Sequence, residues 1–436
     1  MNLIIRGGTL VLEEKTQVAD MLVRSGKIAR IGKGLRAPRA ETVDARGQYV
    51  FPGAIDPHTH HELDLGPGRR SADTFVSGSW VALMSGVTTM FDFAHQEKPG
   101  ETLLRAFDRH QRTLRRQRLY NRILFHSGVM RLADDLEAQI AAVAKRGVRS
   151  FKLCLNSPAM TSEFLWRAFA AIARVDGIAL LHCEDGQIVE YLKRTLHAAG
   201  KRAARFIPAS RPASLETAAL AQALTLARAH GTRLYIVHLS TGEGAQLIAL
   251  AQQAGLPIVA ETCPQYLLLD ESIYRGRNGH LPTCTPPMRT KGDNAELWHA
   301  LQHETISCLA TDHCPFTRAQ KNRFKASFVD YVYGLPGLGT AVPLLLSEMT
   351  RRKFPLPLMG RLLATNAART FGLYPHLGVI RPGAAADLFL YDPRRPYRLP
   401  AQAGNCDWSP FAGRRVSGAV TTTIMDGQVA FLRGND

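Results

Sequence analysis

The chain has 436 residues, of which 45% are hydrophobic and 21% charged, proportions typical of a globular protein and not of a disordered one. It starts with no signal peptide and has no apolar run long enough to cross a bilayer, so we expect a cytoplasmic protein without a membrane partner. Lys and Arg exceed Asp and Glu by 54 to 37, a net charge of +17. Without a nucleic-acid-binding motif, we expect no nucleic-acid partner. The seven cysteines form no C-x-x-C pair, which favours reduced thiols over a cysteine zinc site.

Both ends of the chain consist of short strand-like runs. Residues 1–52 alternate between apolar runs and glycine turns. Residues 376–436 contain the runs 387–391 and 420–425, the second followed by an Asp426-Gly427 hairpin turn. Neither end could bury an apolar face alone, so we predict that the two ends share one small β-sandwich domain.

Eight apolar, β-rich runs follow one another between residues 53 and 375, with amphipathic segments in the gaps. The runs are 53–58, 86–93, 123–126, 150–155, 178–182, 233–238, 257–262 and 305–312. Nearly continuous hydrophobic strands that alternate with amphipathic helices are typical of a buried parallel sheet. Eight of them predict an α/β fold, a (β/α)8 TIM barrel over residues 53–375.

The stretch Asp56-Pro57-His58-Thr59-His60 closes the first of these runs. In an extended strand, side chains two residues apart point to the same side, so His58 and His60 would direct both imidazoles at one point. An isolated His-x-His is more often structural, because a metal site needs further ligands elsewhere in the chain.

Four later strands also carry residues that suit a metal site. In such a barrel the chemistry lies at the carboxyl ends of the strands. Potential ligands on so many strand ends favour one metal site over a set of unrelated polar residues. Its candidate ligands are His58, His60, Lys152, His182, His238 and Asp312.

Each candidate also has a structural interpretation. A buried histidine such as His182 or His238 could simply have its hydrogen bonds satisfied, and Asp312 could cap a helix. Three further histidines close to these strand ends are interpreted as structural: His61, His126 and His313.

Lys152 is the most informative candidate. As an ammonium group it would repel a divalent cation, and it could instead be a structural cation paired with Glu184 or Asp185. Carboxylation of its amine by carbon dioxide would turn it into a two-oxygen anion able to bridge two metals.

Together these motifs resemble the cyclic amidohydrolases, specifically the dihydropyrimidinases and hydantoinases of the metal-dependent amidohydrolase superfamily. The resemblance covers nearly the whole chain and rests on the stretches 56–60, 150–152, 182–186, 237–240, 261–266, 285–289, 311–316, 366–369 and 386–388. It implies two divalent ions, usually zinc, with His58, His60 and Asp312 on one, His182 and His238 on the other, and N6-carboxylated Lys152 bridging both.

The resemblance implies a hydrolase that opens a cyclic amide or imide of the dihydropyrimidine or hydantoin type, at a non-peptide C–N bond. Two divalent ions with one carboxylate and one carbamate carry a charge of about +2, enough to bring the pKa of a bridging water toward neutrality. The hydroxide would attack a ring carbonyl, and Asp312, as the catalytic residue, would pass a proton to the departing nitrogen. The family also implies a homo-oligomer, a tetramer or a dimer.

The substrate-binding residues depart from the family pattern. The family's hydantoinases usually place a tyrosine, whose hydroxyl stabilises the oxyanion, where this chain has Ser157 in a shorter loop. The family's substrate-binding asparagine before Gly-x-Pro-Gly is Tyr333 here, whereas its substrate-contacting Ser/Thr is retained as Thr285. Loss of one oxyanion donor typically costs about 10²-fold in rate, so we expect a replacement.

Two other functions remain open. Dihydroorotases usually follow His-x-His with Arg-Glu-Pro, and His61-Glu62-Leu63 stands here, which disfavours a dihydroorotase. Arg69 and Arg70 nevertheless keep an acidic substrate, or an allantoinase-like ring, open. A non-catalytic scaffold with the amidohydrolase fold would typically have lost metal ligands, and this chain retains all of them.

Overall fold

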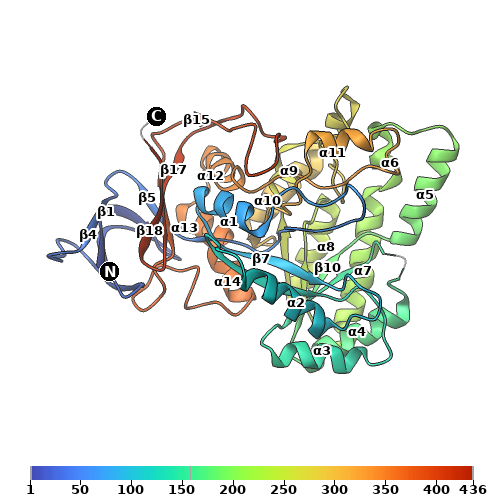
Figure 1. The fold of residues 1–436 in the computed structure, drawn as a ribbon, viewed down its shortest axis with the longest axis horizontal. Coiled ribbons are helices and arrows are strands. Elements are labelled where there is room, and N and C mark those ends of the chain that lie inside the picture. Colours follow the sequence, from blue (N-terminus) through green and yellow to red (C-terminus); the bar gives the residue numbers. More distant parts are fainter. Residues whose placement is uncertain (1, 158, 435–436) are drawn as a thin grey trace.

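The computed structural model describes residues 2–157 and 159–434, in which two large sheets lie side by side (Figure 1). One of them has eight parallel strands in the order β13-β12-β11-β10-β9-β8-β7-β6. Their bounds are β6 Ala54–Asp56, β7 Val87–His95, β8 Arg122–Gly128, β9 Ser150–Cys154, β10 Ile178–His182, β11 Arg233–Ile236, β12 Ile258–Thr262 and β13 Cys308–Leu309. Each of the eight predicted barrel strands is therefore present.

The first and last of these strands meet just beyond their ends. Thr59 forms a parallel bridge with His313, and the backbone N–H of His60 donates to the carbonyl of His313 at 2.7 Å. The carboxylate of Asp56 accepts hydrogen bonds from the backbone N–H and the hydroxyl of Thr311, at 3.2 and 2.6 Å. The sheet is thus nearly closed, and the predicted (β/α)8 barrel is confirmed.

Helices follow the strands and cover the outside of the barrel. Helix α2 buries Leu103, Ala106, Phe107 and Leu114 at helical spacing, with its arginines mostly on the outer side. The hydroxyl of Thr161 caps α4 by accepting from the N–H of Phe164. The helices are α1 Phe75–Met84, α2 Leu103–Arg115, α3 Leu136–Lys145, α4 Ser162–Arg174, α5 Gly186–Ala198, α6 Ile207–Ser210, α7 Ala213–His230, α8 Gly242–Gln253, α9 Pro264–Leu268, α10 Lys291–Gln302, α11 Arg318–Arg323, α12 Ala341–Arg351, α13 Leu356–Gly360 and α14 Asn366–Thr370.

The helices and the cysteines agree with an ordinary globular fold. Among the described residues, no helix combines the length and the apolar character that a membrane span requires. All seven cysteines are free thiols and six of them are buried, as the sequence predicted.

Both chain ends contribute to the second sheet, in the order β18-β17-β14-β5-β1-β2-β3 with β4 paired to β1. Its strands are β1 Asn2–Val11, β2 Thr16–Arg24, β3 Lys27–Gly32, β4 Glu41–Asp44, β5 Tyr49–Pro52, β14 Leu388–Asp392, β17 Ala419–Met425 and β18 Gln428–Leu432, and a separate ribbon joins β15 Tyr397–Arg398 to β16 Arg415–Val416. Strand β5 pairs with β14 so that Phe51 lies opposite Phe389. The sheet buries a core of its own, which includes Ile5, Met21 and Leu388. The predicted small β domain shared by the two ends is therefore confirmed.

An ion-pair cluster joins this terminal sheet to the barrel. Arg122, the first residue of β8, contacts Asp387 at 2.6 Å and Asp426 at 3.1 Å. The Asp387 carboxylate is only 2% exposed and also accepts from the backbone N–H of Asp426. A buried carboxylate of this kind depends on its cation, since an unpaired buried charge is strongly unfavourable.

Arg122→Ala is therefore expected to lower the free energy of unfolding by about 3 kcal/mol, because Asp387 stays buried without its cation. Equilibrium unfolding in urea measures the effect. Adding Asp387→Asn should recover part of the loss, and Arg116→Ala, at an exposed position, serves as the control. A loss below about 0.5 kcal/mol for Arg122→Ala would contradict this interpretation.

Candidate metal centre

Three ligand-type side chains meet where the first and last barrel strands end. Nε2 of His58 lies 3.1 Å from Nε2 of His60, and Oδ1 of Asp312 lies 3.2 and 3.3 Å from these two nitrogens. The three ligand atoms all lie within 4.8 Å of one another, close enough to share one cation. His58 is buried, whereas His60 and Asp312 are partly exposed, so the cluster opens toward the barrel mouth.

Glu261, on β12, fixes the orientation of His58. Its Oε1 lies 2.5 Å from Nδ1 of His58 and also accepts from the backbone N–H of His238, while its Oε2 accepts from the hydroxyl of Tyr235 at 2.7 Å. A carboxylate that holds one nitrogen of an imidazole leaves the other nitrogen for a metal. The sequence analysis assigned no role to Glu261. Its position one residue before the end of a barrel strand could have indicated that it lies near the metal ligands.

His182 and His238 form a second pair next to the first cluster. Nδ1 of His182 lies 2.9 Å from Nε2 of His238, and the rings of His238 and His58 have centroids 5.3 Å apart. Nε2 of His182 is held by Glu184 at 2.8 Å, and Glu184 also binds Arg211 at 2.6 Å. Burial lowers the pKa of His182 and of His238, so both rings are neutral, the form that binds metal.

Two of the candidate ligands adopt an unusual backbone conformation. His238 has φ of 40° and Asp312 has φ of 50°, in the left-handed region that non-glycine residues rarely adopt. Such conformations persist where the surrounding structure enforces them, and they concentrate at functional sites. Asp312 lies beside His58 and His60 and caps no helix, so the capping alternative is wrong.

Lys152 points to the same region from β9. It is 3% exposed, and its Nζ lies 5.2 Å from the centroid of the Phe93 ring. Within residues 2–157 and 159–434, the amine has no hydrogen bond and no ion pair. Glu184 is engaged with His182 and Arg211, and Asp185 instead caps α5 by accepting from two backbone N–H groups. The alternative of a structural ion pair with either carboxylate is therefore wrong.

The three histidines interpreted as structural have partners away from this cluster. His126 binds the hydroxyl of Ser150 at 2.6 Å and donates to the carbonyl of Pro57 at 3.1 Å. Asp92 holds His61 at 2.9 Å and Asp73 holds His313 at 3.1 Å. These contacts fit the structural interpretation.

The candidate substrate residues lie on three segments, two of which meet. Ser157 follows β9, and its backbone N–H donates to the carbonyl of Cys154; Pro158, its neighbour, lies outside the described residues. The segments that carry Thr285 and Tyr333 meet where the N–H of Gly334 donates to the carbonyl of Thr283 at 2.8 Å. The Tyr333 hydroxyl already donates to the carbonyl of Phe328 at 2.7 Å.

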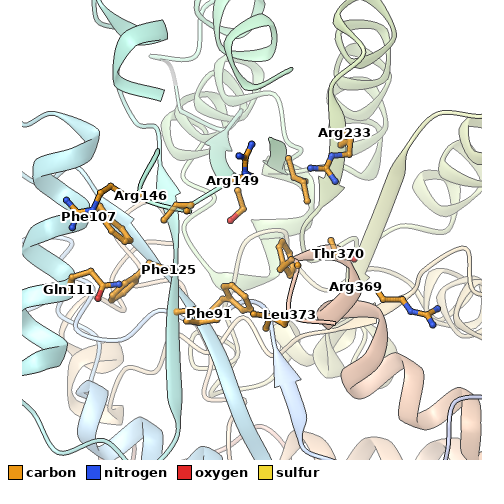
Figure 2. A pocket seen from close by; sticks show the side chains of 17 residues that line it. Phe91, Phe107, Gln111, Phe125, Arg146, Arg149, Arg233, Arg369, Thr370 and Leu373 are labelled. Atoms are coloured by element: carbon orange, nitrogen blue, oxygen red, sulfur yellow. The ribbon is translucent and has the colours of Figure 1, made fainter. Parts of the chain in front are cut away.

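A cavity of about 570 Å³ lies at the opposite, amino-terminal end of the strands (Figure 2). Ser150, Ile178 and Arg233, the first residues of β9, β10 and β11, line it together with aromatic rings such as Phe91. Its arginines have partners of their own, for example Arg233 with Asp176, and Figure 2 shows the Arg369 guanidinium pointing away from Phe91. No candidate metal ligand is among the described residues that line this cavity, so the cavity and the candidate metal centre lie at opposite ends of the barrel.

Known proteins are similar to this chain over nearly its whole length. The model of the amidohydrolase family matches residues 49–430. The chain belongs to the amidohydrolase family. A D-hydantoinase from Geobacillus stearothermophilus is 33% identical over 98% of this chain and 92% of its own. Membership therefore extends to the group that contains the hydantoinases and dihydropyrimidinases.

Solved structures of this family agree with the fold. The dihydropyrimidinase from Brevibacillus agri NCHU1002 is similar with a TM-score of 0.93 and 29% identity, over 98% of this chain and 95% of that one. The L-hydantoinase from Arthrobacter aurescens is similar with a TM-score of 0.91 and 28% identity, over 99% and 96%. A divalent metal site is characteristic of the amidohydrolase family, and the His58, His60 and Asp312 cluster is a candidate for it.

Glu261→Gln is expected to weaken binding of divalent metal about 10- to 100-fold, because a neutral amide orients His58 less firmly than a carboxylate does. Competition with a chelator measures the metal affinity. Asp185→Asn, which changes a helix cap at the same end of the barrel, is the matched control. Equal affinities in Glu261→Gln and wild type would mean that Glu261 does not support a metal ligand.

Proposed function

We propose that this protein is a binuclear metal-dependent hydrolase that opens a cyclic amide or imide ring of the dihydropyrimidine or hydantoin type. One observation carries the proposal. The His58, His60 and Asp312 cluster lies directly beside the His182–His238 pair, in a barrel whose relatives are named hydantoinases and dihydropyrimidinases.

We assign His58, His60 and Asp312 to one ion, His182 and His238 to the other, and Lys152, carboxylated on its amine, to both. Zinc suits this set of imidazoles and carboxylates. The surroundings of Lys152 support the assignment. The side chain is almost wholly buried and its amine is paired with no carboxylate in the described residues, whereas a carbamate would have two cations to bind.

Two divalent ions at this place would polarise a ring carbonyl and provide hydroxide at neutral pH. Asp312 would accept the proton of the attacking water and deliver it to the departing nitrogen. Although burial raises the pKa of Asp312, the adjacent His58 and His60 bring it below its ordinary value, so the carboxylate is ionised and able to accept a proton. Glu261 and Glu184 would hold the ligand rings in place.

Thr285, Ser157 and Tyr333 remain our candidates for contact with the substrate. Because the Tyr333 hydroxyl is already engaged with a backbone carbonyl, its ring is the part available to a substrate. Ser157 carries a hydroxyl, but on a shorter side chain than the tyrosine usual in the family.

The alternatives have less support. A dihydroorotase-like substrate carries a carboxylate, but Arg70 binds Glu62 at 3.2 Å and the Arg69 guanidinium lies 4.4 Å from the centroid of the Phe324 ring. With both arginines engaged, a neutral ring is favoured over an acidic one. A non-catalytic scaffold is disfavoured because all six ligand-type side chains are retained.

We make three further proposals, of which the first follows from the resemblance and the others from the sequence. We propose a homo-oligomer, a tetramer or a dimer, located in the cytoplasm, and light scattering of the purified protein tests the assembly. We also propose domain limits at residues 1–52, 53–375 and 376–436. The gap between β5, which ends at Pro52, and β6, which begins at Ala54, supports the first limit.

The zinc-loaded protein is expected to open hydantoin or dihydrouracil, because Arg70 is paired with Glu62 and Arg69 packs over the Phe324 ring. Loss of the ring's ultraviolet absorbance, or chromatography of the product, measures turnover. Dihydroorotate and allantoin are the comparison substrates. Activity on one of these two alone would favour the alternative amidase, and no activity on any of the four would favour the scaffold.

Lys152→Ala is expected to abolish both turnover and the binding of two metals per chain, because no other residue supplies the bridging anion. Elemental analysis and the ring-opening assay measure the two effects. Short carboxylates such as acetate should partly restore both, and Lys145→Ala, on an exposed lysine of α3, is the control. Wild-type turnover in Lys152→Ala would show that no bridge exists.

A further inference from the structure

His95, the last residue of β7, lies at the same end of the barrel as the candidate metal ligands. The register of β7, β8 and β9 pairs His95 with Gly128, and Gly128 with Lys152. Paired positions of neighbouring parallel strands direct their side chains to the same face. His95 and Lys152 therefore both point into the barrel, with only a glycine between them.

The absence of a side chain at Gly128 makes room for the His95 ring. A Cβ atom at Gly128 would lie 2.3 Å from Nδ1 of His95, which is closer than real contacts allow. The ring is nearly parallel to that of Phe93, at 5.6 Å between centroids, and to that of His60, at 6.2 Å. Packing thus fixes His95 directly beside one candidate ligand.

The imidazole of His95 forms no hydrogen bond with the described part of the chain. His61, His126 and His313 are each held by a side chain, whereas neither ring nitrogen of His95 has a hydrogen-bond partner in the described part of the chain. Its Nδ1 is buried as well. Because Nδ1 packs against Gly128, Nε2 is the ring nitrogen that remains available to a ligand.

We propose that His95 supplies the hydrogen-bond donor that this chain lacks at Ser157. Its Nε2–H, on the side of the ring away from Gly128, contacts the carbonyl oxygen of the substrate ring, where negative charge develops during hydrolysis. This role rests on the proposed function, and it explains how a chain without the usual tyrosine remains competent. The Tyr333 hydroxyl does not fill the role, since it donates to the carbonyl of Phe328.

His95→Leu tests the inference, with zinc-loaded protein and hydantoin or dihydrouracil as the probe. The expected result is a fall in kcat of about 100-fold, with KM within about threefold of wild type, because the donor acts mainly as charge develops. Two metals per chain and an unchanged thermal midpoint should accompany it. His95→Gln, whose amide N–H can donate, should recover at least about tenfold of the loss. His110→Leu, on α2, is the control histidine.

The outcomes separate the two proposals. If wild type is active and His95→Leu keeps both metals and turns over within about threefold of wild type, the inference is wrong and the proposed function stands. If His95→Leu loses metal, or if His95→Gln recovers nothing, His95 only positions His60 and the donor role is wrong. If zinc-loaded wild type opens none of the four rings, the proposed function fails and the inference fails with it.

Discussion

The arrangement at the barrel mouth depends on one buried carboxylate, that of Asp56. It accepts hydrogen bonds from the backbone N–H groups of His58 and Thr311, and from the Thr311 hydroxyl. His58 is itself held by Asp56, and Asp312 directly follows Thr311, the other residue that Asp56 holds. The contacts that join the first strand to the last therefore also set the separation between two candidate ligands. A change that loosened this junction would alter the metal site before it altered the rest of the barrel.

Behind the candidate ligands lies a layer of buried, hydrogen-bonded acidic side chains. Glu261 holds His58, and Glu184 holds His182. Burial alone would raise the pKa of Glu184, but Arg211 and His182 bring it down to about 2, so it remains an acceptor for the ring. The imidazoles of His58 and His182 are thus oriented before any cation binds, which reduces the reorganisation that binding requires. The geometry of the candidate site therefore depends on the residues behind the ligands as well as on the ligands themselves.

Sequence reasoning predicted the eight strands and the two-ended β domain because buried strands are apolar along their length and turns are rich in glycine. The candidate ligand set followed from the positions of His, Lys and Asp on the strands, and the structure brings five of its side chains into two adjacent groups. Residues such as Glu261 and His95 were not found, because their importance depends on contacts between strands far apart in the chain. His95 matters only beside Gly128 and Lys152, a relation that pairing register creates. Ser157, Thr285 and Tyr333 lie in loops, where spacing along the chain says little about position.

The sheet that unites the chain ends has a consequence for biosynthesis. Strand β5 pairs with β14, which is synthesised only after all eight barrel strands. During translation, the edge of β5 that pairs with β14 therefore stays unpaired until all eight barrel strands have emerged from the ribosome. Such distant partners delay completion and expose apolar surface in the interval. The amino-terminal segment is thus the part of this enzyme with the greatest need of chaperone protection during translation.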